Sequence, residues 1–329
     1  MASRESGLRS RLESKLHKQR WDSMSVRKLN LILIPEKAMT GKADFRLIAE
    51  LIKDKCNDIV PRVLSRRQAT WMQFLYLFRP SLYVAFYEAK QFKPMRGKCL
   101  HGDNMTKSEQ YLQLESCGLR TVQWKSISAG QTYDPAAWGP YVIVKPDSGR
   151  MGMDVRIRKT GRIRYEKDCP NGQPFLIQKF VHTGEQPVSY RACTFFGEIL
   201  YLQKSINTSC GSLLNDPSSA EEIGGHNPVA TAAKGSAELV FDQEIIAFAK
   251  HIALTAFKDI PLLGQDIVRD LATGELYCLE VNPFGSTWHF SSKAGAGIQS
   301  ANSMDFKSQF NAFDKVADIL IRKTREQAR

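Results

Sequence analysis

A change in hydrophobic periodicity divides this sequence into two kinds of architecture. Up to about residue 105, short apolar runs alternate with segments in which apolar residues recur at helical spacing. The predicted strands cover residues 29–34, 59–64 and 81–86, and the predicted helices surround residues 45–52 and 68–77. Because strands that alternate with helices usually form parallel sheets, residues 26–105 predict a small parallel α/β domain.

The remaining sequence is dominated by extended segments from Tyr141 onward. It begins with a short helix that Gly118 is well placed to end, and the segment 196–198 predicts a hairpin turn. Extended segments are predicted at 141–145, 153–158, 175–181, 188–196, 198–206, 262–268 and 275–281, and helices at 239–257 and 306–320. These patterns predict an α+β region in the second part of the chain.

The net charge of +12 suggests an anionic partner, but its distribution narrows the choice. Residues 1–28 carry eight basic and three acidic residues, and residues 321–329 carry four and one, so most of the charge lies at the two ends. A basic nucleic-acid-binding protein is therefore the less favoured alternative. Residues 1–25 form a basic leader, which the spacing of Leu8, Leu12 and Leu16 predicts to be helical.

The sequence lacks the marks of a secreted or membrane-spanning protein. Its seven cysteines are scattered without a C-x-x-C pair, which disfavours a disulfide framework or a zinc site. No apolar run reaches the roughly 20 residues of a spanning helix, and no apolar core of a secretory signal is present near residue 1. We therefore expect a cytoplasmic protein without a membrane span, for which a homodimer is left open.

A lysine followed by a glycine-bearing turn lies between two of the extended segments. The stretch 144–155 contains Lys145, Gly149 and Gly152. Glycines let backbone amides approach phosphate oxygens, and a lysine adds a positive charge. No helix follows the turn, which excludes a Walker A loop and a dinucleotide fingerprint. This pattern favours a phosphate site, and a hairpin turn with an incidental lysine is the alternative.

A second group of polar residues lies on the last predicted hairpin. With the turn centred on Thr273, Asp266 is expected directly opposite Glu280, and Asn282 shares their face. Two carboxylates and an amide suit a hard cation such as Mg²⁺, which takes a few carboxylates together with phosphate oxygens. The alternative is the solvated polar face of a half-buried strand.

These two motifs, in this order, resemble those of the ATP-grasp ligases. The family has a strand, a lysine, a glycine-rich turn and a second strand first, and a metal-binding E-x-N strand last, which Leu279–Pro283 resembles. The resemblance covers about residues 26–325. It implies an α/β (α+β) ATP-grasp fold, in which the N-terminal domain (26–105) precedes an ATP-grasp domain (106–329). Within that domain, a small lid subdomain at about 120–180 and a C-terminal subdomain at 181–329 would sandwich ATP.

The resemblance also implies roles for individual residues. ATP would be bound by Lys107, Lys145, Ser148, Gly149, Met151, Gly152, Gln178, Lys179, Phe180, Val181 and Glu185. One or two Mg²⁺ ions, which Mn²⁺ could replace, would be held by Asp266, Glu280 and Asn282. Arg191 and Lys204 would be catalytic, and Asn207, Gly285 and Ser286 would contact the substrate. The chain departs from the family at Gln178-Lys179, where a glutamate is frequent, and in the segment 283–288.

The activity implied is that of an ATP-dependent carboxylate–amine ligase. Such an enzyme joins a small-molecule carboxylate to an amine through an acyl-phosphate and releases ADP and phosphate. Kinase-like or carboxylase-like chemistry is the alternative within the family, and an ATP-binding scaffold without turnover is another. Phosphoryl transfer depends on charge neutralisation and alignment more than on an acid–base residue, so lysines, an arginine and a metal suffice.

Other tempting residues are assigned structural roles. His226 and His289 are expected to be loop or packing residues. The aromatic residues Trp71, Phe74, Tyr76 and Phe78 could form a stacking platform for nucleic acid, but a packed helix face is the favoured interpretation. Ser148 and Ser286 lack a partner base in the sequence, which disfavours a hydrolase triad.

Overall fold

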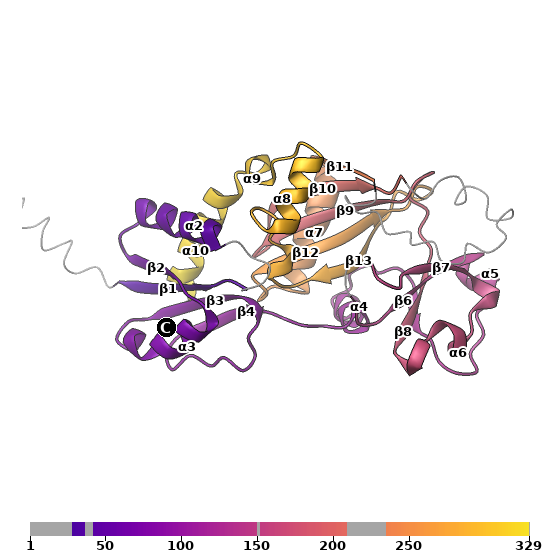
Figure 1. Cartoon of the computed structure of the whole chain (residues 1–329), viewed down its shortest axis with the longest axis horizontal. Coiled ribbons are helices and arrows are strands. Elements are labelled where there is room, and N and C mark those ends of the chain that lie inside the picture. Colours follow the sequence, from indigo (N-terminus) through magenta and orange to yellow (C-terminus); the bar gives the residue numbers. More distant parts are fainter. Residues whose placement is uncertain (1–27, 37–41, 150–151, 209–234, 329) are drawn as a thin grey trace, which may run out of the picture.

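The computed structural model describes residues 28–36, 42–149, 152–208 and 235–328, which form three β-sheets with flanking helices (Figure 1). The first sheet is parallel and the other two are antiparallel. This arrangement confirms the predicted mixed α/β class. The basic leader lies outside the described residues.

The parallel sheet has the strand order β2-β1-β3-β4. Helix α2 (Lys42–Lys55) and helix α10 (Ala312–Gln327) share the apolar cluster on one face, so the last helix of the chain returns to the first sheet (Figure 1). Helix α3 (Arg66–Met72), capped by Ser65, and the 3-10 helix η1 (Gln73–Tyr76) pack on the other. The strands are β1 (Leu29–Ile34), β2 (Ile59–Val63), β3 (Ser81–Glu88) and β4 (Lys98–Gly102).

The largest sheet has five strands in the order β11-β10-β9-β12-β13. Phe196 and Gly197 join β9 to β10 with φ angles of 46° and 85°, so the predicted hairpin turn is present. Helix α7 (Gln243–Thr255) begins after its N-cap Asp242 and buries its apolar face on this sheet. The strands are β9 (Val188–Phe195), β10 (Glu198–Ile206), β11 (Ser236–Leu239), β12 (Leu262–Arg269) and β13 (Leu276–Asn282).

A smaller antiparallel sheet has the strand order β5-β8-β6-β7. The short helices α5 (Pro135–Trp138) and α6 (Tyr165–Asp168) flank it, and alternate residues of β6 and β8 form its apolar core. Helix α4 (Lys107–Ser116) contacts β13 of the large sheet and reaches the small sheet through the side chains of Ser108 and Tyr111. The strands are β5 (Trp124–Ser126), β6 (Tyr141–Pro146), β7 (Arg156–Lys159) and β8 (Phe175–Lys179).

Several predicted boundaries are wrong for identifiable reasons. The helix predicted at 239–257 starts four residues later, because Ser236–Leu239 pairs with β10 as an edge strand. The helix predicted at 306–320 is interrupted where Asn311 adopts a left-handed conformation, with φ of 50°. This leaves α9 (Phe306–Gln309) as a separate turn before α10. Strand β4 and helix α8 (Lys293–Ala301) were not predicted.

The aromatic segment before β3 also differs from the prediction. Tyr76 is buried, but Trp71, Phe74 and Phe78 are 75%, 49% and 89% exposed, so the expected packed helix face is wrong. The short helix buries only one side chain, Ala69, and presents its large apolar residues to solvent. Among the described residues, none of the helices is both long and apolar enough to cross a bilayer.

Candidate active site

A cavity of about 210 Å³ lies between the small sheet and the large sheet. Strands β6 and β8 and the loops that follow them form one wall, and β9, β12 and β13 form the other, with the first residue of α4 at one end. Its apolar lining includes Ile143, Val155, Phe180, Val181, Val188, Val268 and Leu279. Its polar lining includes Lys107, Lys145, Gln178, Arg191, Asp266, Glu280 and Asn282.

The acidic residues enter this cavity from the hairpin β12–β13. Asp266 is the direct partner of Glu280, and Asn282 is the partner of Gly264, as the register inferred from the sequence requires. A β-bulge after Asp266 shifts the register of the rest of the hairpin by one residue. The bulge lies on the turn side, so the three polar side chains keep one common face.

Arg191 approaches the same hairpin from the neighbouring strand β9, where it pairs with Asp266. Its Nε lies 2.6 Å from Asp266 Oδ1, and a second guanidinium nitrogen donates to Oδ2 at 3.0 Å. This two-atom contact fixes the plane of the guanidinium. Burial by itself would lower the pKa of Arg191, but the charge of Asp266 raises it above its usual value, so Arg191 stays cationic.

Two lysines reach the cavity from different elements. Lys107 opens helix α4, whose N-cap Thr106 forms a capping box with Glu109. Its Nζ donates to the carbonyl of Gly149 at 3.3 Å and lies 3.6 Å from Glu280. Lys145 lies in β6 and is buried. Burial lowers the pKa of Lys145 to about 8, because the charged amine loses water, although the charge of Glu280 acts in the opposite direction.

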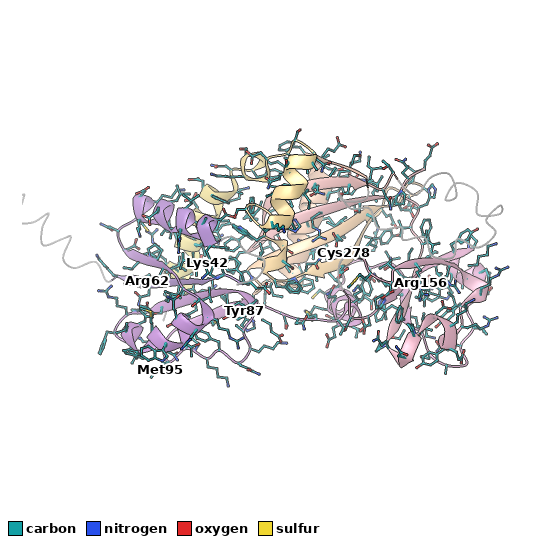
Figure 2. The ribbon with its side chains drawn as sticks, viewed as in Figure 1. Lys42, Arg62, Tyr87, Met95, Arg156 and Cys278 are labelled. Carbon is teal, nitrogen blue, oxygen red and sulfur yellow. The ribbon has the colours of Figure 1, made fainter. Side chains whose placement is uncertain are left out.

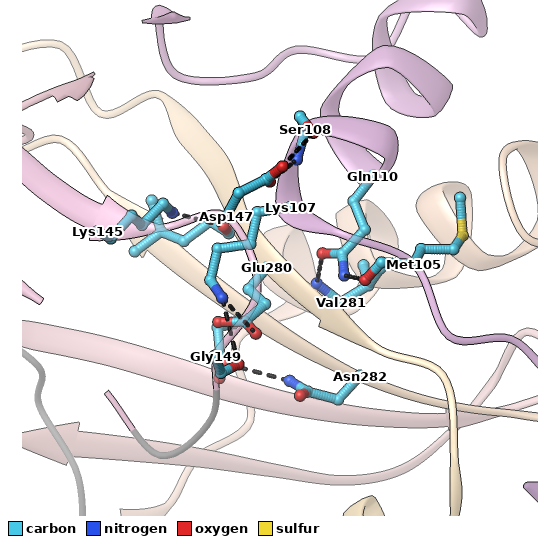
Figure 3. A network of polar contacts seen from close by, with 12 residues as sticks. Met105, Lys107, Ser108, Gln110, Lys145, Asp147, Gly149, Glu280, Val281 and Asn282 are labelled. Atoms are coloured by element: carbon cyan, nitrogen blue, oxygen red, sulfur yellow. Dashed lines mark hydrogen bonds and ion pairs between the residues drawn. The ribbon is translucent and has the colours of Figure 1, made fainter. Parts of the chain in front are cut away.

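Helix α4 connects the small sheet to the β12–β13 hairpin, which carries Asp266 and Glu280 (Figure 3). The backbone and hydroxyl of Ser108 donate to the carboxylate of Asp147, both at 2.8 Å. Gln110 accepts from the backbone of Val281 at 2.9 Å and donates to the carbonyl of Met105 at 3.1 Å. Helix α4 therefore holds the turn after β6 and the strand β13 at fixed positions on either side of the cavity.

Tyr111, also on α4, organises the buried lysine. Lys145 Nζ donates to the Tyr111 hydroxyl at 2.7 Å and to the carbonyl of Leu279 at 3.2 Å. The same hydroxyl lies 2.8 Å from Gln178 Oε1 and 2.7 Å from the Leu279 carbonyl, and its single proton can be donated to either. Sequence reasoning placed Tyr111 only in a helix and did not consider Ser108 or Gln110. The spacing of Gln110 and Tyr111, three and four residues after Lys107 on the same short helix, was the available signal.

The segment expected to hold adenine divides between the cavity and solvent. Gln178, Phe180 and Val181 line the cavity. Lys179 is exposed and is not part of the lining, because successive residues of a strand point to opposite faces. Glu185 is also exposed, on the loop that precedes β9, and the structure does not bring it to the cavity lining.

Several other predicted site residues do not line the cavity. Ser148 and Gly149 are exposed on the turn after β6 and do not line the cavity, whereas Gly152 does, and Met151 lies outside the described residues. Lys204 pairs with Glu238 on the edge of the large sheet at 3.1 Å. The remaining three, Asn207, Gly285 and Ser286, follow the ends of β10 and β13.

His289 lies behind this site and has a packing role, as expected. Its ring stacks on Tyr201, and Nδ1 is 3.2 Å from the Tyr201 hydroxyl. Burial lowers the pKa of His289 to about 4, and the nearby charge of Arg191 acts in the same direction. The imidazole is therefore neutral at pH 7. His226 lies outside the described residues.

The polar lining also fits a divalent cation that shares its ligands with phosphates. Asp266, Glu280 and Asn282 offer two carboxylates and an amide at one end of the cavity. Within the described part of the chain, no cluster of three or more His, Cys, Asp or Glu residues is arranged as a complete metal site. Two carboxylates are nevertheless sufficient for Mg²⁺, which is commonly held by one or two carboxylates together with substrate phosphates and water.

The sequence matches no protein-family model and no curated protein. The fold is similar to solved ligase structures. D-cycloserine synthetase DcsG is 15% identical with a TM-score of 0.49, over 88% of this chain and 99% of its own. The ATP-grasp ligase PsnB, solved with its precursor peptide and AMPPNP, is 13% identical with a TM-score of 0.49, over 91% and 98%. A D-alanine–D-alanine ligase from Bacillus anthracis is 14% identical with a TM-score of 0.44, over 91% and 97%. Identities this low leave the function to be argued from the site.

Proposed function

We propose that the chain is an ATP-dependent carboxylate–amine ligase of the ATP-grasp type. The observation that carries the proposal is the convergence, in one cavity between two sheets, of Lys107, Lys145 and Arg191 with the two carboxylates of the last hairpin. The apolar part of the lining, which includes Phe180 and Leu279, suits a flat nucleobase. The charged part suits a triphosphate with a divalent cation.

The proposed reaction would use this arrangement of charge. A carboxylate oxygen of the substrate attacks the γ-phosphorus of ATP, and the bond to the ADP oxygen breaks. The amine nitrogen then attacks the carbonyl carbon of the acyl-phosphate, which loses phosphate, and a proton leaves the nitrogen. Lys107 and Lys145 would neutralise the phosphate oxygens. Arg191, held in one plane by Asp266, would stabilise the negative charge that develops on the transferred group.

Mg²⁺ bound by Asp266, Glu280 and Asn282 would neutralise further phosphate charge. The roles of Ser148, Gly149 and Met151 in closing over the phosphates belong to the proposal, as do the domain boundaries at residues 26, 106 and 181. A small-molecule carboxylate and amine, and a cytoplasmic setting, complete it.

The test is a screen of amino acids and small carboxylic acids in which ADP and phosphate are measured separately. A ligase releases ADP and phosphate in equal amounts and only when both carboxylate and amine are present. A kinase would release ADP without phosphate, and that result would refute the ligase assignment. Lys145→Met should abolish turnover, whereas Lys125→Met should retain it, because Lys125 is an exposed lysine on the same small sheet outside the cavity lining.

A further inference from the structure

An exposed apolar patch lies on the N-terminal parallel sheet, away from the cavity. We call Trp71, Phe74, Leu75, Phe78 and Met95 the apolar patch, and their exposed fractions range from 49% to 89%. The first four belong to α3, η1 and the residues after them. Gln73 accepts from the backbone of Met95 at 3.0 Å, which holds the loop before β4 against η1. Figure 2 shows Met95 at the outer edge of the molecule.

The side chains of the apolar patch are not part of the hydrophobic core. The inward side of α3 and η1 is complete, because Ala69 and Tyr76 are buried in an apolar cluster with Ile32 and Tyr83 of the sheet. A second hydrogen bond, from the Arg96 guanidinium to the carbonyl of Leu77 at 2.6 Å, fixes the same loop. Five large apolar side chains therefore extend into solvent from a surface that these hydrogen bonds hold in place. An exposed apolar patch of this kind usually marks an interaction site.

Basic residues surround the patch. The stretch 59–87 contains no aspartate or glutamate. Arg66, Arg67, Arg79 and Lys93 are exposed, and none of them forms an ion pair with a carboxylate among the described residues. This combination of apolar side chains and unpaired cations disfavours a second copy of the chain, because two such surfaces would repel each other. It favours an anionic partner.

We propose that the apolar patch and these cations form a peripheral binding surface for an anionic membrane. Aromatic and aliphatic side chains can enter the boundary between headgroups and acyl chains while flanking arginines and lysines contact lipid phosphates. Stable attachment usually requires two signals. Here they are the apolar side chains of the patch and the flanking cations.

The sheet topology places further basic residues along one end of the parallel sheet. Neighbouring strands of a parallel sheet begin at the same end of the sheet. Lys28 before β1, Arg79 before β3 and Arg96 before β4 therefore lie along that end. A flat lipid surface can contact charges that are spread along one end of a sheet, whereas an acidic peptide would need a groove to hold it. Trp71, Phe74 and Phe78 could also stack on nucleobases, but the aliphatic side chains of Leu75 and Met95 gain more from burial at the acyl chains of a membrane.

Vesicle sedimentation of the full chain tests the proposal. We expect binding to phosphatidylcholine vesicles with 30% phosphatidylserine, weak binding to phosphatidylcholine alone, and release at 0.5 M NaCl. The variant Trp71→Ser/Phe74→Ser/Phe78→Ser should lower the partition at least tenfold. Arg66→Glu/Arg67→Glu should lower the partition onto anionic vesicles about fivefold or more for each residue replaced. The control Phe241→Ser/Leu271→Ser removes two side chains of similar exposure elsewhere and should bind normally.

Three outcomes would overturn the membrane assignment. The first is the absence of binding to anionic vesicles, and the second is unchanged binding by the triple variant. The third is a lipid-independent role, seen if the triple variant abolishes self-association in sedimentation velocity or tight binding of a labelled oligonucleotide. Should the triple variant unfold, Phe78→Ser, at the most exposed position, provides the same comparison. Turnover of ATP without vesicles should be unchanged in all of these variants, since the patch does not line the cavity.

Discussion

Replacing Tyr111 by phenylalanine removes one oxygen atom from the centre of the candidate site. That oxygen accepts a hydrogen bond from Lys145 at 2.7 Å and lies within bonding distance of Gln178 and the Leu279 carbonyl. The ring is 1% exposed, so water cannot replace the lost hydroxyl. The variant therefore leaves Lys145 with one protein acceptor, the Leu279 carbonyl.

The expected size of the effect follows from the charge on the lysine. A hydrogen bond to a charged group is worth about 1.5–3 kcal/mol, so Tyr111→Phe should lower the free energy of unfolding by that amount near pH 7. A loss of about 1.4 kcal/mol from the charged form lowers a pKa by about one unit. The pKa of Lys145, already lowered by burial to about 8, should then fall towards about 7.

The assay is ATP binding by calorimetry between pH 6.5 and 9.5, together with urea unfolding. At pH 8 the protonated fraction of Lys145 should fall from about half to about a tenth, which raises the Kd for ATP about fivefold. Tyr83→Phe is the matched control, because the Tyr83 hydroxyl is buried without a hydrogen-bond partner among the described residues. It should leave the Kd for ATP unchanged and should not lower the free energy of unfolding, because the substitution removes a buried hydroxyl that has no partner. Equal effects of the two substitutions would refute the proposed role of Tyr111.

Four further predictions concern the same cavity. In the wild-type chain, ATP affinity should fall about tenfold per pH unit above pH 8 as Lys145 loses its proton, and calorimetry checks this. The free energy of unfolding should change in the opposite sense. Between pH 8 and 10.5 the unfolded state binds more protons than the native state, so the contribution of Lys145 to the free energy of unfolding rises with pH. Lys145→Met should abolish both the trend in ATP binding and the trend in urea unfolding. Gly264→Ala should lower turnover and cost about 1–3 kcal/mol, because the new Cβ would lie 3.1 Å from Arg191 and 2.6 Å from Thr287, whereas Gly161→Ala enters open space and should be neutral. Arg191→Lys keeps the charge but loses the two-atom contact to its carboxylate partner, so ligase turnover should fall at least tenfold while circular dichroism stays unchanged.

The parts of the site that depend on local periodicity could be predicted from the sequence. Side chains on a strand alternate between two faces, so the pairing of Asp266 with Glu280 followed from the position of one turn. The bulge in that hairpin could not be predicted, since it adds a residue without a change in the polar pattern. The pairs on the turn side are offset by one residue from the predicted register, as Ile267 opposite Cys278 shows, and the bulge restores the predicted pairing of Asp266 with Glu280.

Contacts between distant elements could not be predicted in the same way. The hydrogen bonds from the backbone of Val281 to Gln110 and from Lys145 to Tyr111 join residues 171 and 34 positions apart, and no periodicity links such pairs. The return of α10 to the first sheet is of the same kind. The exposed aromatics around Trp71 show the opposite error, in which apolar residues were assumed to pack although nothing in the described chain covers them.

Binding of a non-hydrolysable ATP analogue is the most direct test of the central claim that the cavity between the two sheets is a Mg·ATP site. Calorimetry with AMPPNP should show one site on the wild-type chain, tighter in the presence of Mg²⁺ than in EDTA. Lys145→Met should weaken it at least tenfold at either condition, and Glu280→Gln should remove most of the gain from Mg²⁺. The absence of a binding signal, or equal affinities for the wild-type chain and Lys145→Met, would contradict the claim.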